Sequence, residues 1–128
     1  MQDLPAILVV EDDNLLHTFF EEALGDGGIE PTITASGEEA VTLLKGHIGK
    51  YRALVTDINL RGKIDGWEVA QLAREIDPEF PVVYASGTAA ADWASKGVPN
   101  SIMLSKPFAP AQLLTAVANP LNTGTPTT

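Results

Sequence analysis

The fold of this chain is decided first by the stretch Ala6-Ile7-Leu8-Val9-Val10-Glu11-Asp12-Asp13. Five apolar residues, three of them β-branched, are followed directly by three acids. An uninterrupted short apolar run is typical of a strand that is buried on both faces, as in a parallel sheet. The acids then lie at the carboxyl end of that strand, where a fully apolar environment would not accommodate them.

Outward from this stretch, a strand followed by a helix is predicted five times. Helices are expected at 14–25, from Ser36 onward, at 67–76, near 89–96 and at 111–118, and the other strands at 30–35, 53–56, 81–85 and 101–104. Such alternation predicts an α/β domain with helices on both faces of a five-stranded parallel sheet. Right-handed crossovers favour the doubly wound (βα)5 arrangement with strand order 2-1-3-4-5, as in flavodoxin-like folds.

Length and composition limit the classes of protein to consider. The 128 residues suit one domain, expected at 1–121 with a flexible tail at 122–128. Seventeen acids against eight bases give a formal net charge of −9, which argues against direct nucleic-acid binding. No apolar run is long enough to insert into a membrane, no leader pattern opens the chain, and cysteine is absent, so a cytoplasmic location is expected.

Polar residues with chemical potential follow four of the predicted strands. Glu11 and Asp12 come after the first, Asp57 after the third, Ser86 after the fourth and Lys106 after the fifth. Ligand sites in open parallel sheets lie beyond the carboxyl ends of the strands, where the strand order reverses. Strands one and three are neighbours in the expected order, so their carboxylates should meet at one crevice.

Carboxylates that lie this close repel one another unless a cation sits among them. Mg²⁺, for which Mn²⁺ could substitute, accepts a few carboxylate oxygens, keeps some water and leaves a position for a phosphoryl group. The sequence therefore predicts a magnesium site. Asp57 could attack phosphorus to give an acyl phosphate, while Lys106 and Ser86 would each contact a phosphoryl oxygen.

Each residue also has a simpler interpretation when it is taken alone. The acids after the first strand could cap a helix, Asp57 could start a turn, Ser86 could be a cap and Lys106 a solvated surface charge. Independent caps, however, give no reason for acid, acid, hydroxyl and lysine to follow strands one, three, four and five. The two histidines, His17 and His47, are expected in helices away from this edge, as ordinary surface or packing residues.

Four motifs together carry a family resemblance. They are Ile7-Leu8-Val9-Val10-Glu11-Asp12-Asp13, Leu54-Val55-Thr56-Asp57, Ala85-Ser86-Gly87 and Lys106-Pro107-Phe108. In this order and spacing, over about residues 5 to 121, the chain resembles the CheY-like receiver domains of bacterial two-component response regulators.

The resemblance implies a phosphoacceptor regulatory domain rather than an enzyme. It makes Asp57 the phosphoacceptor, Ser86 the switch hydroxyl and Lys106 the phosphate-pairing lysine, and it makes Glu11, Asp12, Asp57 and the backbone carbonyl of Asn59 the metal ligands. It implies a sensor histidine kinase or a histidine phosphotransfer protein as donor. It also implies a switched surface, formed by the fourth helix, fifth strand and fifth helix, that binds a partner or a second copy of the chain.

The chain departs from the family pattern at three places. Leu60 and Arg61 stand where Met-Pro is common, the loop containing Arg61-Gly62-Lys63 is about one residue longer than usual, and Met103 replaces the family's rotating aromatic. The start of the third helix is therefore in doubt. An unbranched thioether fills several rotamers, so we expect Met103 to be a pliable filler and the switch to run through Ser86.

Other functions remain to be compared. A flavodoxin-type carrier would need a phosphate-binding loop where the acids stand, and a haloacid-dehalogenase-like phosphatase would need a second carboxylate at Asn59. A receiver that only docks a partner is a third alternative. The chain is expected to be a stand-alone receiver, the alternative being a segment of a hybrid histidine kinase or of a larger regulator.

Overall fold

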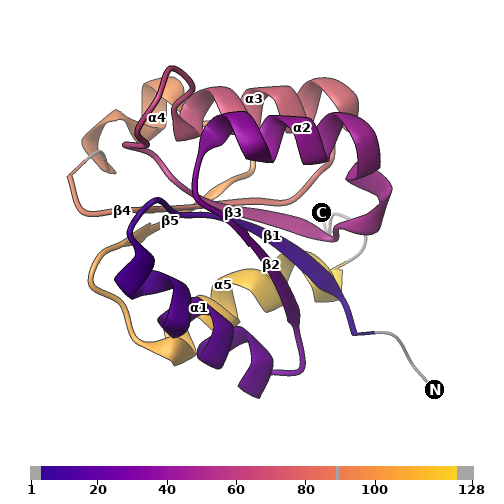
Figure 1. Cartoon of the computed structure of the whole chain (residues 1–128), viewed down its shortest axis with the longest axis vertical. Coiled ribbons are helices and arrows are strands. Elements are labelled where there is room, and N and C mark those ends of the chain that lie inside the picture. Colours follow the sequence, from indigo (N-terminus) through magenta and orange to yellow (C-terminus); the bar gives the residue numbers. More distant parts are fainter. Residues whose placement is uncertain (1–3, 89, 124–128) are drawn as a thin grey trace.

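The structure is a computed structural model that describes residues 4–88 and 90–123. At its centre is a five-stranded sheet in the order β2-β1-β3-β4-β5 (Figure 1). The strands are β1 (Ala6–Val10), β2 (Glu30–Thr34), β3 (Ala53–Asp57), β4 (Val82–Ser86) and β5 (Ile102–Ser105). Every neighbouring pair is parallel. The predicted doubly wound α/β fold and its strand order are confirmed.

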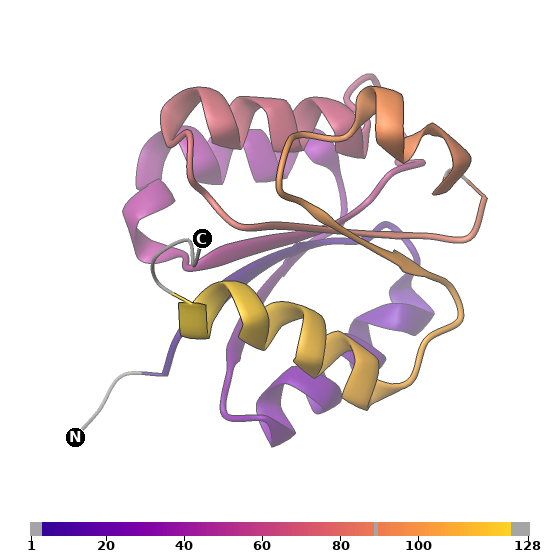
Figure 2. The same ribbon diagram turned by 180° about the vertical axis from the view of Figure 1, so that it is seen from behind.

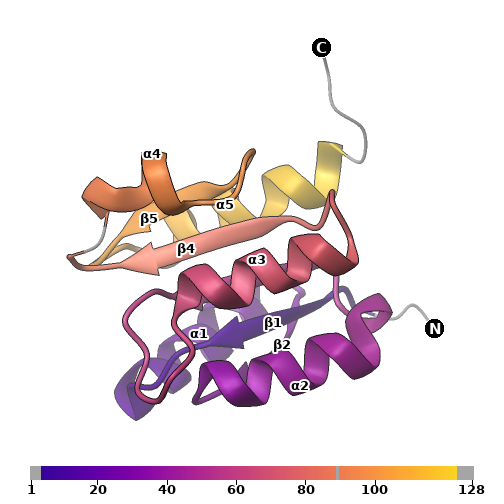
Figure 3. The same cartoon turned by 90° about the horizontal axis from the view of Figure 1, so that it is seen from above.

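Helices cover both faces of this sheet. The helices α1 (Asn14–Asp26) and α5 (Pro110–Thr123) lie on one face, and α2 (Gly37–His47), α3 (Gly66–Ile76) and α4 (Trp93–Lys96) lie on the other (Figures 1 and 2). Figure 3 shows α2 and α3 running side by side. Short 3-10 turns occupy Ile48–Lys50 and Ala90–Asp92. Within the described ranges, no helix has the length and apolar character that a membrane span requires.

The sheet separates two apolar cores. In β1, Leu8 and Val10 belong to the cluster beneath α2 and α3, whereas Ile7 and Val9 belong to the cluster beneath α1 and α5. Successive side chains of a strand point to opposite faces. Because helices cover both faces, every residue of β1 is buried. This explains why the sequence shows an unbroken apolar run instead of an alternating one.

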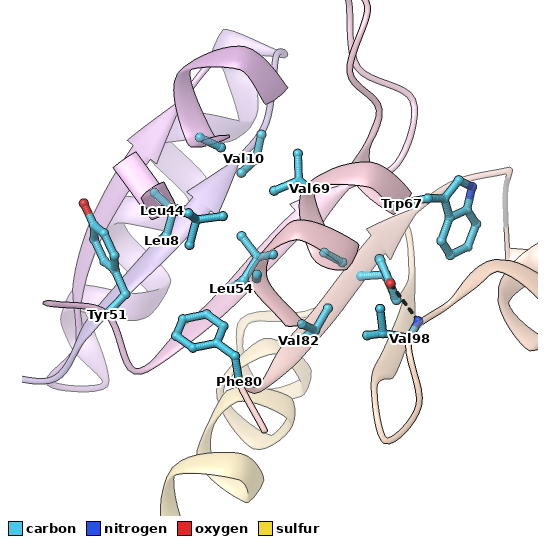
Figure 4. Packing of buried hydrophobic residues seen from close by; sticks show 14 of the residues in the cluster. Leu8, Val10, Leu44, Tyr51, Leu54, Trp67, Val69, Phe80, Val82 and Val98 are labelled. Atoms are coloured by element: carbon cyan, nitrogen blue, oxygen red, sulfur yellow. Dashed lines mark hydrogen bonds between the residues drawn. The ribbon is translucent and has the colours of Figure 1, made fainter. Parts of the chain in front are cut away.

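The first of these cores is seen in Figure 4, where Leu8 and Val10 of β1 face side chains from α2 and α3. A polar contact lies inside it. The hydroxyl of Tyr84, a buried residue of β4, accepts a hydrogen bond of 3.0 Å from the backbone N–H of Val98. The contact ties the central part of β4 to the segment that follows α4.

Side chains cap the first two helices. Asp13 is the residue that caps α1, which settles the choice among the acids that follow β1. Ser36 caps α2 by accepting the backbone N–H of Glu39 at 3.1 Å, as predicted. The Glu39 carboxylate accepts the N–H of Ala35 at 3.3 Å, so it reaches one residue further back than a capping box requires.

The predicted bounds were wrong at the fourth and fifth helices. The region predicted as a helix near 89–96 is a 3-10 turn followed by one α-helical turn, Trp93–Lys96, and residue 89 lies outside the described residues. The last helix was expected to end near 118, but it continues through Pro120 to Thr123. A proline has a helical φ, although inside a helix it lacks one N–H donor and crowds the carbonyl four residues earlier. Residues 122 and 123 of the predicted tail thus belong to α5, and residues 124–128 lie outside the described residues.

Candidate functional site

The candidate residues lie at the carboxyl ends of the central strands. Glu11 directly follows β1, Asp57 is the last residue of β3, Ser86 is the last residue of β4 and Lys106 directly follows β5. The backbone N–H of Lys106 donates to the carbonyl of Ser86 at 2.9 Å, which continues the strand pairing by one residue. Parallel strands with matched registers thus bring residues from four distant parts of the sequence to one edge.

Three carboxylates meet at this edge. Oxygen atoms of Glu11, Asp12 and Asp57 all lie within 4.8 Å of one another. Only about 1% of the Glu11 side chain is exposed, against 16% for Asp12 and 12% for Asp57. Three hard oxygen donors in this arrangement fit a divalent cation such as Mg²⁺. The three carboxylates predicted to bind a metal therefore lie close together. The part of the Asn59 carbonyl in metal binding stays a prediction.

Lys106 is paired with two of these carboxylates. Its Nζ lies 2.7 Å from Oε1 of Glu11 and 3.3 Å from Oδ2 of Asp57. Burial alone would lower the pKa of Lys106, but the hydrogen bond with Glu11 and the negative charge of Asp57 outweigh it and raise the pKa. The ammonium group therefore stays charged, next to the carboxylate that is predicted to react.

For Glu11, burial determines the direction of the pKa shift, whereas for Lys106 the contacts with carboxylates together outweigh burial. Burial raises the pKa of Glu11, the hydrogen bond from Lys106 opposes that rise, and the nearby Asp57 charge adds to it, so that the net shift is upward. The main cause is burial of the Glu11 side chain, and the neighbouring Asp57 charge adds to it. A cation at this site would favour the ionised form of Glu11.

Asp57 is held from both sides. Its Oδ1 accepts the backbone N–H of Ile58 at 2.7 Å, which leaves Oδ2 facing Lys106. Behind it lies Gly66, the first residue of α3, where a Cβ would come within 2.0 Å of the Asp57 carbonyl oxygen. The Gly66 N–H also donates to the Ile58 carbonyl at 2.9 Å. Helix α3 therefore packs directly against the backbone of the predicted acceptor.

Two hydroxyls and an amide link the loops after β3 and β4. Ser86 is buried, and its Oγ accepts the backbone N–H of Thr88 at 3.3 Å. The Thr88 hydroxyl accepts a hydrogen bond of 3.1 Å from the side-chain amide of Asn59. The side chain of Asn59 is thus directed to the β4 loop, whereas its backbone carbonyl is the group predicted to bind the metal.

For two residues of this region the sequence did not predict the contact that the structure shows. Arg61 donates its backbone N–H to Oδ2 of Asp12 at 3.0 Å, and its Nε lies 3.6 Å from the same oxygen. His17 was expected away from the edge, which was wrong, because its Nε2 lies 2.5 Å from the carbonyl oxygen of Glu11. Its position in the first turns of α1, close to the end of β1, was the available signal. His47 is exposed at the end of α2, as expected.

Comparison with known proteins places this arrangement in a family. A family model described as the response regulator receiver domain matches residues 7–118. The chain therefore belongs to the response-regulator receiver domains of two-component systems.

Individual relatives agree with this membership. The chain is 35% identical over 104 residues to the response regulator receiver protein CpdR of Brucella abortus, a match that covers 80% of this chain and 84% of that protein. A crystal structure of a response regulator receiver protein from Sinorhizobium medicae is 48% identical, has a TM-score of 0.89 and covers 94% of this chain and 96% of its own.

A third match concerns the fold. The receiver domain of the sensor histidine kinase PA1611 from Pseudomonas aeruginosa, solved with a magnesium ion coordinated in its active site cleft, has a TM-score of 0.78. It covers 91% of this chain and 97% of its own, at 24% identity. At that level of identity the likeness concerns the fold, and the ion is a property of that protein.

Proposed function

We propose that this receiver domain accepts a phosphoryl group on Asp57 from a phosphohistidine donor in a Mg²⁺-dependent reaction and then changes its partner-binding surface. The observation that carries the proposal is the position of Asp57 Oδ2. It lies 3.3 Å from the Lys106 ammonium, and the Asp57 carboxylate belongs to the group of oxygens that Glu11 and Asp12 complete. Phosphoryl transfer needs a nucleophilic oxygen, a positively charged side chain and a site for a divalent metal ion. At this edge of the sheet, Asp57 offers the first, Lys106 the second and the three carboxylates the third.

The residues divide the chemistry among them. An oxygen of Asp57 attacks phosphorus, the P–N bond of the donor breaks, and the imidazole leaves with the bonding electron pair, which gives an acyl phosphate on this chain. Mg²⁺, or Mn²⁺ in its place, held by Glu11, Asp12, Asp57 and the Asn59 carbonyl, would neutralise charge on the transferring group. Lys106 exchanges its contact with Glu11 for one with a phosphoryl oxygen. A receiver domain with magnesium in its cleft supports this metal assignment.

Ser86 is the residue proposed to transmit the change. Phosphorylation adds about −1.5 to −2 charge and three strong hydrogen-bond acceptors beside it. The Ser86 hydroxyl moves to donate to one of them and releases the Thr88 N–H, which it accepts at 3.3 Å in the present structure. Thr88 and Asn59 are hydrogen-bonded, so the loops after β3 and β4 move together. Met103, half-buried against the core beside β4, fills the space that changes.

Partners follow from the exposed surface and the charge. Leu15, in the first turn of α1 beside the site, is 85% exposed and offers an apolar contact to a histidine kinase or a histidine phosphotransfer protein. The net charge of −9 disfavours nucleic acid as a direct partner. The face formed by α4, β5 and α5 is the proposed output surface, including dimer formation. We propose a stand-alone regulatory role without turnover, the alternative being a segment of a hybrid kinase or larger regulator.

The test is labelling with a small acyl phosphate donor, followed by intact-mass measurement. The wild-type chain should gain one phosphoryl group in the presence of Mg²⁺ or Mn²⁺ and none when EDTA removes the metal. Asp57→Asn should gain none under either condition. Labelling of Asp57→Asn at another residue would overturn the acceptor assignment. Turnover of phosphomonoesters would instead favour a phosphatase, although the amide of Asn59, bonded to Thr88, cannot serve as the general acid of that chemistry.

A further inference from the structure

The loop between β3 and α3 is held by two carboxylates from other parts of the chain. One is Asp12 at the candidate site, and the other is Glu38 in the first turn of α2. Both accept backbone N–H groups of the loop, from Arg61 at 3.0 Å and from Lys63 at 2.9 Å. Residues 60–63 of this loop are where the sequence departs from the family pattern, and the proposed phosphoryl transfer gives these four residues no role.

The Glu38 end fixes the backbone of the loop. Gly62 has φ +97°, and a Cβ there would lie 2.9 Å from Oε1 of Glu38. The hydrogen bond from Lys63, with further donors from the backbone of Glu38 and Ile64, lowers the pKa of the Glu38 carboxyl, so it is ionised at neutral pH. The path of the backbone is therefore set independently of the Arg61 side chain, and this path brings Arg61 to Asp12.

At the Asp12 end a positive charge stands next to a proposed metal ligand. The Nε atom of Arg61 lies 3.6 Å from Oδ2 of Asp12, while 87% of the Arg61 side chain is exposed. Lys106 contacts Glu11 and Asp57, so the two cations are paired with different carboxylates of the same group.

We propose that Arg61 is a charge-balancing and positioning residue of the phosphoryl-transfer site, which weakens cation binding and strengthens binding of the anionic phosphoryl donor. The inference rests on the proposed function. A guanidinium 3.6 Å from Oδ2 of Asp12 competes electrostatically with a divalent ion for that carboxylate. The same charge attracts a phosphoryl dianion. Its effects on the two ligands are therefore opposite in sign.

The size of both effects is limited by solvent. An ion pair with an exposed partner changes binding by small factors and is screened by salt. We expect Arg61→Ala to bind Mg²⁺ about two- to threefold more tightly at low ionic strength, and to need about two- to threefold more acyl phosphate donor for half-maximal labelling at saturating Mg²⁺. Arg61→Lys, which keeps the charge, should resemble the wild type in both measurements.

The experiment titrates Mg²⁺ alone into the full chain by calorimetry, at low and high ionic strength, and measures labelling rate against donor concentration. The control is Lys45→Ala, which removes the same charge from an exposed residue in the last turn of α2. Lys45→Ala should match the wild type, and the Arg61→Ala difference should vanish at high salt.

The possible outcomes distinguish a failure of the Arg61 proposal from a failure of the proposed phosphoryl-transfer function. Mg²⁺ affinity that is unchanged or weaker in Arg61→Ala overturns the inference, as does an equal change in Lys45→Ala. Weaker binding of both Mg²⁺ and donor would assign Arg61 a purely structural role. If the wild-type chain gives no heat of binding with Mg²⁺, the proposed metal site itself fails, and this inference fails with it.

Discussion

Gly66 shows how tightly the candidate site is built at the level of single residues. The first residue of α3 leaves no room for a Cβ, which would meet the Asp57 carbonyl oxygen at 2.0 Å and the Ile58 Cα at 2.7 Å. Both obstacles are backbone atoms, so a rotamer change cannot relieve them. Any larger residue must move either the start of α3 or the predicted phosphoacceptor.

We therefore expect Gly66→Ala to lower the free energy of unfolding by about 2 kcal/mol or more, because it forces a backbone shift in a packed region. Gly25→Ala is the matched control, since Gly25 lies inside α1 with nothing within 4 Å of the Cβ position. That change should be neutral or stabilising by up to about 1 kcal/mol. The free energies of unfolding of the two variants can be measured by urea unfolding. A similar decrease in both variants would contradict the explanation that the Gly66 Cβ position is blocked by backbone atoms.

The residues that could be predicted from the sequence are those placed by strand ends. Each of them follows an apolar run that forms a strand, and the carboxyl ends of parallel strands lie at the same edge of the sheet. These residues are Glu11, Asp57, Ser86 and Lys106. Arg61 could not be placed in this way, because its contact with Asp12 depends on the path of a loop. No periodic rule describes the conformation of such a loop.

At the level of whole elements, the link between the β3–α3 loop and α2 explains how the site keeps its shape. Helix α3 begins with a capping box, in which Asp65 and Glu68 exchange hydrogen bonds between side chain and backbone. Glu38 of α2 holds the other part of the loop through the Lys63 N–H. The loop is thus fixed at both ends, and the doubtful start of the third helix is a well-capped one.

The pH dependence of this link has a definite sign. The pKa of Glu38 is lowered in the folded chain, first by the hydrogen bond from Lys63. Its contribution to stability is therefore complete above the ordinary pKa of glutamate and is lost as the pH falls through the lowered value. We expect Glu38→Gln to reduce the melting temperature at neutral pH, with a difference from the wild type that shrinks in acid. A difference that grows in acid would contradict the assignment.

Element boundaries were the least predictable part of the fold. The strands β4 and β5 each lie one residue later than expected, and α4 is one turn long although an Ala-rich stretch favoured a longer helix. Helix α5 continues to Thr123, although it was expected to end near residue 118. Local propensity indicates which kind of element forms, whereas the ends of helices fray and are defined only to within one or two residues.

At the level of the whole molecule, the excess of acid has a consequence for stability. The net charge is −9, and three of the acids are gathered at one edge of the sheet. Self-repulsion of this kind opposes the compact state, and an ion that binds only the folded chain offsets it.

We expect Mg²⁺ at about five times its dissociation constant to stabilise the folded chain by about 1 kcal/mol, which corresponds to a rise of a few degrees in melting temperature. Because any salt screens surface charge, the control is NaCl at equal ionic strength. Asp12→Asn should respond to the two salts alike. A wild-type chain whose melting temperature rises equally with NaCl and MgCl2 would show that screening, and no specific site, is responsible.

The two apolar cores on opposite sides of the sheet also bear on how such a chain tolerates sequence change. Ile7 and Val9 of β1 share no cluster with Leu8 and Val10, although they are adjacent in the chain. Energetic effects of substitutions that share no partners tend to add. Substitutions in the core beneath α2 and α3 should therefore combine almost additively with substitutions in the core beneath α1 and α5, so either core can change in evolution without requiring a matching change in the other.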